Sequence, residues 1–239
     1  MAIESPSNIG QRAPTPHPRD TGPLRFCMVT TFYPPYYFGG DAVFVYRLSE
    51  ALAELGHHVE ECDPAIDREA VVPTFLTLAS ANTVVNLASH PSAGRSPRED
   101  EVERITWLTA QRGERVSGPD YVRATQAAHR LGRQMAAFHS QWDVLLTPGL
   151  AAVPVKLGWL DMMMNDFDEY WRRVFAFSPF TVWFNITGQP AMMLPLAQNT
   201  EGLPIAVQLV ARYGDEVTLF RLGAQLEAQR PWFRRKPAL

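Results

Sequence analysis

Cysteine, lysine, positive charge and long apolar runs are all scarce in this chain, and each scarcity excludes a class of protein. The 239 residues include two cysteines, Cys27 and Cys62, too few for a scaffold of several disulfides or a four-thiolate zinc site. The net charge is −3, which lacks the basic excess of a general nucleic-acid-binding surface. No uninterrupted apolar run approaches the roughly 18 residues that cross a bilayer. We therefore expect neither nucleic acid nor a membrane as a partner.

Proline dominates the start of the chain, where residues 1–23 contain five prolines and no apolar segment typical of a secretory signal. Proline removes backbone donors and interrupts periodic patterns, so the segment is predicted to be a disordered tail. Residues 233–239 form a second short tail. The missing signal and the low cysteine count together favour a cytoplasmic protein.

The ordered part of the sequence begins with an apolar, β-prone run at residues 24–31. An amphipathic pattern follows over 42–55 and ends at Gly56, which suits a left-handed residue after a helix. Residues 57–62 read as a second strand. Residues 24–62 are therefore predicted to form a strand–helix–strand unit, the smallest piece of a parallel sheet.

Long helical patterns alternate with short strands over residues 63–232, which we treat as a second region. Helices are expected at 67–89, 97–114, 120–140, 168–177 and 215–229, and strands at 144–146, 180–184, 191–196 and 205–210. An irregular loop is expected at 149–166. The fold class predicted is α/β, a partial mixed sheet flanked by helices.

Few residues form a pattern typical of a reactive site. The six histidines include no pair at metal-ligand spacing, so neither a metal nor another cofactor is predicted. Gly39 and Gly40, between a strand and a helix, are candidates for binding an anion, with a plain turn as the alternative. Lys156, a candidate base, lies in a proline-rich loop and is expected to be solvated. The methionines 162–164 and the aromatic segment 171–184 suit either a core or an apolar pocket.

Two segments near the carboxyl end resemble the amidase signature family: Trp183–Pro195 and Gly202–Glu216. The resemblance extends over about residues 52–232, and the Met- and Trp-containing loop is similar to that of cyclic amide hydrolases of the 6-aminohexanoate dimer type. It implies an amidase fold and hydrolysis of the C–N bond of a small amide substrate. By the same resemblance, the candidate substrate-pocket residues are Trp183, Phe184, Asn185 and Thr187.

The sequence also departs from the family. Met193 stands where a serine is common, and Ala206 and Ala211 stand where glycine is common. Members hydrolyse amides with a Lys–Ser–Ser triad, which lies upstream of the region matched here, so no residue can be assigned to it. The resemblance therefore implies a truncated, catalytically incomplete amidase portion that is inactive alone.

Residues 24–59 also resemble the start of two-domain retaining glycosyltransferases, in which a glycine pair sits beside the donor diphosphate. This second resemblance implies a fusion at a helix–strand element common to both families. Three functions stay open: the incomplete amidase portion, a module that binds a complementing chain or a second copy of itself, and nucleotide-sugar binding through Gly39 and Gly40.

Overall fold

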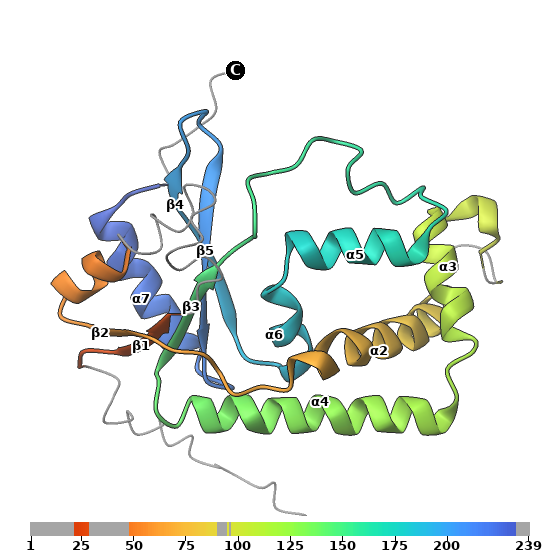
Figure 1. Cartoon of the computed structure of the whole chain (residues 1–239), viewed down its shortest axis with the longest axis horizontal. Coiled ribbons are helices and arrows are strands. Elements are labelled where there is room, and N and C mark those ends of the chain that lie inside the picture. The colour runs from red at the N-terminus through yellow and green to blue at the C-terminus, as the bar shows by residue number, and fades with distance from the viewer. Residues whose placement is uncertain (1–21, 29–47, 90–94, 96, 233–239) are drawn as a thin grey trace, which may run out of the picture.

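The computed structural model describes residues 22–28, 48–89, 95 and 97–232. Its centre is a five-stranded sheet in the order β2-β1-β3-β5-β4 (Figure 1). The strands are β1 (Arg25–Met28), β2 (His58–Glu61), β3 (Val144–Pro148), β4 (Ala191–Gln198) and β5 (Pro204–Ala211). The pairs β1–β2 and β1–β3 are parallel, whereas β3–β5 and β4–β5 are antiparallel. The predicted mixed sheet is confirmed.

The expected strand–helix–strand unit is present where the chain is described. Residues 48–54 are helical, Gly56 takes φ +86°, and β2 returns parallel to β1. Residues 29–47, which include Gly39 and Gly40, lie outside the described residues.

Helices cover both faces of the sheet. Successive β3 side chains point to opposite faces, so this strand contributes to the core on each side. Val144 and Leu146 pack with Leu52 and with Leu222 of α7 (Glu216–Gln229). Leu145 packs on the other face, among side chains of α4 (Gly118–Phe138) and α6 (Thr181–Thr187). All three β3 side chains are at most 1% exposed, so this strand is the centre of both cores.

A layer of helices extends beyond the sheet (Figure 1). It comprises α2 (Arg68–Ala88), the short η1 (Glu99–Glu101), α3 (Arg104–Gly113), α4 and α5 (Phe167–Phe177). α2 packs against α3, α4 and α6. By length and composition α2 is apolar enough to cross a membrane, and 17% of its most apolar window is buried.

Two expected elements are wrong. Residues 180–184 begin the helix α6 rather than a strand, since as a helix this run buries Val182 and Phe184 in the core and ends at the left-handed Gly188. The helix expected from Pro97 begins at Arg104 instead. In front of it, the Glu101 carboxylate accepts a hydrogen bond from the Arg98 amide at 2.8 Å, which caps η1 as a separate turn.

Candidate functional site

The four predicted pocket residues lie on the single short helix α6, and the structure does not gather them into one pocket. Phe184 is buried in the core at 6% exposure, and the Thr187 hydroxyl, also buried, donates to the Trp183 carbonyl at 2.9 Å. Trp183 is half-buried beneath the Arg68 guanidinium, 5.6 Å from its ring centroid. Asn185 alone is exposed. Phe184 and Thr187 therefore position this helix, while Trp183 and Asn185 are the ones a ligand could reach.

Gln189, which the sequence analysis did not single out, directly follows this helix. It is 6% exposed, and its side-chain oxygen has no hydrogen-bond partner among the described residues. Gly188 turns the chain with φ +78°, beneath the Tyr213 ring. A buried amide oxygen left unpaired costs about 1–3 kcal/mol, so Gln189 is a polar group in need of a partner. In the sequence, the only local feature that marks Gln189 is its place between a glycine and a proline.

The carboxyl end of β3 carries a second polar pair inside the sheet. The Gln208 amide donates to the Thr147 hydroxyl at 3.1 Å, and that hydroxyl donates to the Pro148 carbonyl at 3.0 Å. Next along the chain, Gly149 approaches β4 so closely that a Cβ would lie 2.7 Å from the Met193 sulfur. Met193, where the family commonly has serine, is 44% exposed and covers this glycine.

The loop 149–166 is irregular, as predicted, and α5 holds it in place. The Arg173 guanidinium donates to the Trp159 carbonyl at 3.0 Å and lies over the Trp159 ring. Glu169 accepts from Arg172 and Arg173, and those hydrogen bonds lower the pKa of its carboxyl to about 2. Glu169 therefore stays ionised at neutral pH and acts as an anchor for the two arginines.

The aromatic segment on α5 packs as a core. Trp171 stacks on Phe175 with centroids 5.4 Å apart, and Phe75 of α2 meets both rings edge-on. The Tyr170 hydroxyl donates to the Met162 sulfur at 2.9 Å. These contacts favour the core interpretation of this segment over the pocket interpretation.

The described residues contain little that resembles a catalytic centre. Lys156 is exposed, as expected, and its amine makes no hydrogen bond to a serine hydroxyl in the described part of the chain. Lys236 lies outside it, as do the anion-binding candidates Gly39 and Gly40. No group of three histidine, cysteine, aspartate or glutamate side chains within residues 22–28, 48–89, 95 and 97–232 is arranged to hold a metal ion.

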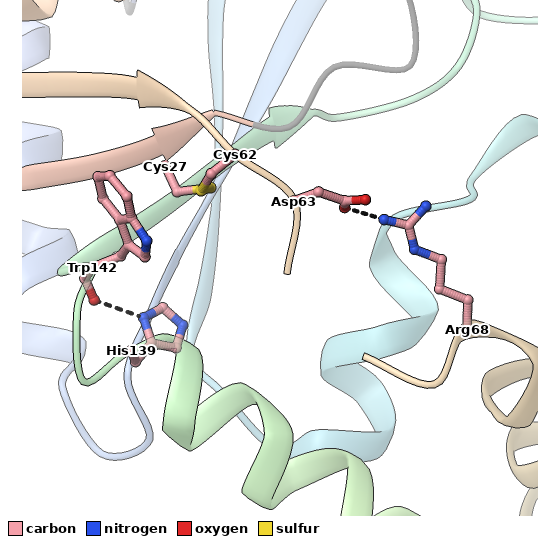
Figure 2. The surroundings of a disulfide bond; sticks show 6 residues. All are labelled: Cys27, Cys62, Asp63, Arg68, His139 and Trp142. Carbon is pink, nitrogen blue, oxygen red and sulfur yellow. Dashed lines mark hydrogen bonds and ion pairs between the residues drawn. A yellow bond between two sulfur atoms is a disulfide. The ribbon is translucent and has the colours of Figure 1, made fainter. Parts of the chain in front are cut away.

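A disulfide joins Cys27 of β1 to Cys62, just after β2 (Figure 2). Their Cα atoms are 5.5 Å apart, within the usual range for a disulfide. Cys62 borders a cavity of about 480 Å³, whose wall also includes Trp142. The low cysteine count excluded a scaffold of several disulfides but did not predict this single bridge. Its signal lay in the register, because Cys27 pairs with Glu60 and Cys62 is two residues further on.

The fold, an α/β mixed sheet with helices on both faces, matches that of solved amidase-type hydrolases. The family named Amidase matches residues 17–220, so the chain belongs to the amidase family. The 6-aminohexanoate-cyclic-dimer hydrolase of Pseudomonas sp. (strain NK87) is 32% identical over 198 residues, which cover 79% of this chain and 40% of that protein. The enzyme of the same name from Paenarthrobacter ureafaciens is 31% identical over 199 residues, with the same coverage.

Solved structures give the same result. A structure of 6-aminohexanoate cyclic dimer hydrolase superimposes with a TM-score of 0.77 and 26% identity, covering 94% of this chain and 50% of that one. The substrate complex of an enzyme of that name gives a TM-score of 0.74. The chain thus spans about half the length of the relatives it matches, or less. The family match includes residues 24–59, and the resemblance of that segment to glycosyltransferases stays a prediction.

Proposed function

We propose that this chain supplies one half of an amidase-family hydrolase for a small amide, and that it hydrolyses no amide alone. The fold supports the reaction class, since cleavage of an amide C–N bond is the chemistry for which the two first relatives are named. The observation that carries the incompleteness is Lys156, which is exposed in a loop rather than buried beside serines. A lysine that lies beside no serine hydroxyl cannot act as the base that activates one.

The substrate-facing part of this half is the end of α6. The exposed Asn185, the half-buried Trp183 and the unpaired oxygen of Gln189 lie within seven residues of one another. Trp183 and Asn185 are two residues apart on the helix, so they face different sides of it. The exposed Asn185 amide is therefore the group that would orient a small, neutral amide by hydrogen bonds.

The test is an assay of the purified full chain on 6-aminohexanoate cyclic dimer, alone and mixed with the separately expressed remaining half of the Pseudomonas hydrolase. We expect no turnover from the chain alone and measurable turnover from the mixture. Turnover by the chain alone that persists in Lys156→Ala and resists a serine-directed inhibitor would reveal a different centre. No turnover from a mixture that does form a complex would contradict the proposed role.

A second candidate is a partner-binding module, and one observation favours it. α2 is strongly apolar although little of it is buried. Apolar helix faces of this kind are typical of surfaces that other chains cover. Light scattering on the purified chain separates the outcomes: a monomer at all concentrations contradicts self-association, and a dimer supports a homo-oligomer.

A further inference from the structure

A groove of about 550 Å³ opens where α2, the end of α3 and α4 meet. It is separate from the end of α6 discussed above, because none of those residues lines it. Its charged lining consists of four arginines and one aspartate: Arg112, Arg115, Arg123, Arg130 and Asp120. Four guanidinium groups facing one carboxylate leave a local excess of positive charge in a chain whose net charge is −3.

The single carboxylate of the groove is already engaged. Asp120 accepts from the Ser117 hydroxyl at 2.5 Å and pairs with Arg123 at 2.5 Å, as part of the cap that starts α4. These interactions hold the pKa of Asp120 below its usual value, so it stays bound to its partners. Arg112, Arg115 and Arg130 have no ion pair with any described residue. Guanidinium groups remain charged at all ordinary pH values, so the excess is permanent.

Close packing of α3 on α2 fixes the backbone position of Arg112. Gly113, between Arg112 and Arg115, lies so close to α2 that a Cβ would be 2.1 Å from the Ser80 carbonyl oxygen. The Arg112 guanidinium also lies over the Phe167 ring of α5, 5.5 Å from its centroid. The end of α3 is therefore pressed against α2. Arg112 belongs to that helix end, Arg123 and Arg130 belong to α4, and Arg115 lies in the turn between α3 and α4.

We propose that this groove binds a small aliphatic molecule with two or more carboxylate or phosphate groups. Planar guanidinium groups bind both kinds of anion through paired hydrogen bonds. The apolar part of the lining, which includes Pro73, Val116, Ala124 and Ala127, suits an aliphatic linker between the anionic groups. The volume lies within the range of about 300–1,000 Å³ that is usual for small-molecule sites.

Calorimetry on the full chain at fixed ionic strength tests the proposal, with adipate, citrate and inorganic pyrophosphate as probes and 1,6-hexanediol as the uncharged counterpart of adipate. The test variant is the double substitution Arg115→Gln and Arg130→Gln. The matched control is Arg133→Gln with Arg221→Gln, two exposed arginines outside the groove. The groove variant and the control variant each lose two positive charges. A loss of binding in the groove variant alone therefore indicates a specific site and not a general effect of net charge.

We expect at least one anion to bind with a dissociation constant below about 1 mM, at least tenfold weaker binding in the groove variant, and unchanged binding in the control. Hexanediol should not bind. Comparing adipate with pyrophosphate distinguishes a carboxylate from a phosphate ligand. Thr77→Glu, which places a carboxylate in the groove, should abolish binding without removing any arginine. Equal losses in groove and control variants, or no binding of any probe to the folded chain, would overturn the proposal.

Discussion

The His57 ring connects Leu24, where the described strands begin, to Gln225 of the last helix. Its Nδ1 accepts from the Leu24 amide at 3.1 Å, so Nε2 carries the proton and donates to the Gln225 side-chain oxygen at 2.9 Å. The ring also meets Phe26 edge-on at 5.2 Å. One side chain therefore ties β1, β2 and α7 together, which explains how the predicted strand–helix–strand unit is joined to the rest of the chain.

Replacing this ring should weaken the whole fold. His57→Ala removes two hydrogen bonds and an aromatic contact, and we expect the free energy of unfolding to fall by about 1–3 kcal/mol. Urea denaturation measures the change. The control is His58→Ala, next in the chain, whose exposed ring pairs with the exposed Glu60. Equal losses of unfolding free energy in the two variants would show that the contacts of the His57 ring contribute nothing specific.

The helix crossing at Gly113 gives a second prediction. A methyl group there would collide with the Ser80 carbonyl, so Gly113→Ala should cost about 1–3 kcal/mol as α2 and α3 move apart. Gly118→Ala is the control, because a Cβ at that position meets nothing within 4 Å. Thermal unfolding followed by circular dichroism compares the two, and a Gly113→Ala protein as stable as the control would contradict the crossing.

Local sequence patterns predicted those elements well whose structure depends on a single segment of the chain. Residues 191–196 and 205–210 become β4 and β5, which extend one or two residues further, since each is an apolar strand and Asn199 and Gly202 build the turn between them. The aromatic run at 180–184 misled because β-propensity yields to packing: as a helix, the run buries Val182 and Phe184 in the core. The disulfide and the arginine groove depend on strand register and on a helix crossing, which no local pattern encodes.

The Cys27–Cys62 bridge closes a loop of 35 residues, which yields a prediction about reduction. Cross-linking a loop of that length restricts the unfolded chain by about 2–4 kcal/mol, so a reductant should lower the free energy of unfolding by that amount. Urea curves with and without dithiothreitol measure it, and Cys27→Ala with Cys62→Ala should be insensitive to the reductant. Free thiols titrating in the untreated, denatured protein would show that the bridge is not formed. The cytoplasmic location stays a prediction, and a reducing compartment would favour the open form.

Buried His139 should make stability depend on pH. Its Nδ1 donates to the Trp142 carbonyl at 3.2 Å, and its Nε2 is buried with no partner among the described residues. Burial lowers the pKa of this ring, so the unfolded chain takes up the proton first as pH falls. The contribution of His139 to stability is therefore complete above the unfolded value of about 6.5 and declines below it.

Unfolding at pH 7.5 and pH 5.5 tests this dependence in the wild type and in His139→Gln. Other groups titrate equally in both proteins, so the stability difference between them isolates the histidine. We expect the advantage of the wild type to shrink at pH 5.5. A difference that is the same at both pH values would mean that the ring titrates alike in the folded and unfolded chains.

Substitutions at two adjacent residues of α6 should separate the contribution of this helix to stability from its contact with the substrate. Phe184→Ala removes a ring from the core and should cost about 3–5 kcal/mol of stability. Asn185→Ala, on the exposed side, should change stability by less than about 0.5 kcal/mol. In a hydrolase reassembled from two halves, the same Asn185→Ala change should raise KM for the amide, since an orienting hydrogen bond would be lost. An unchanged KM would leave α6 with a packing role alone and transfer the substrate contact to Trp183 or Gln189.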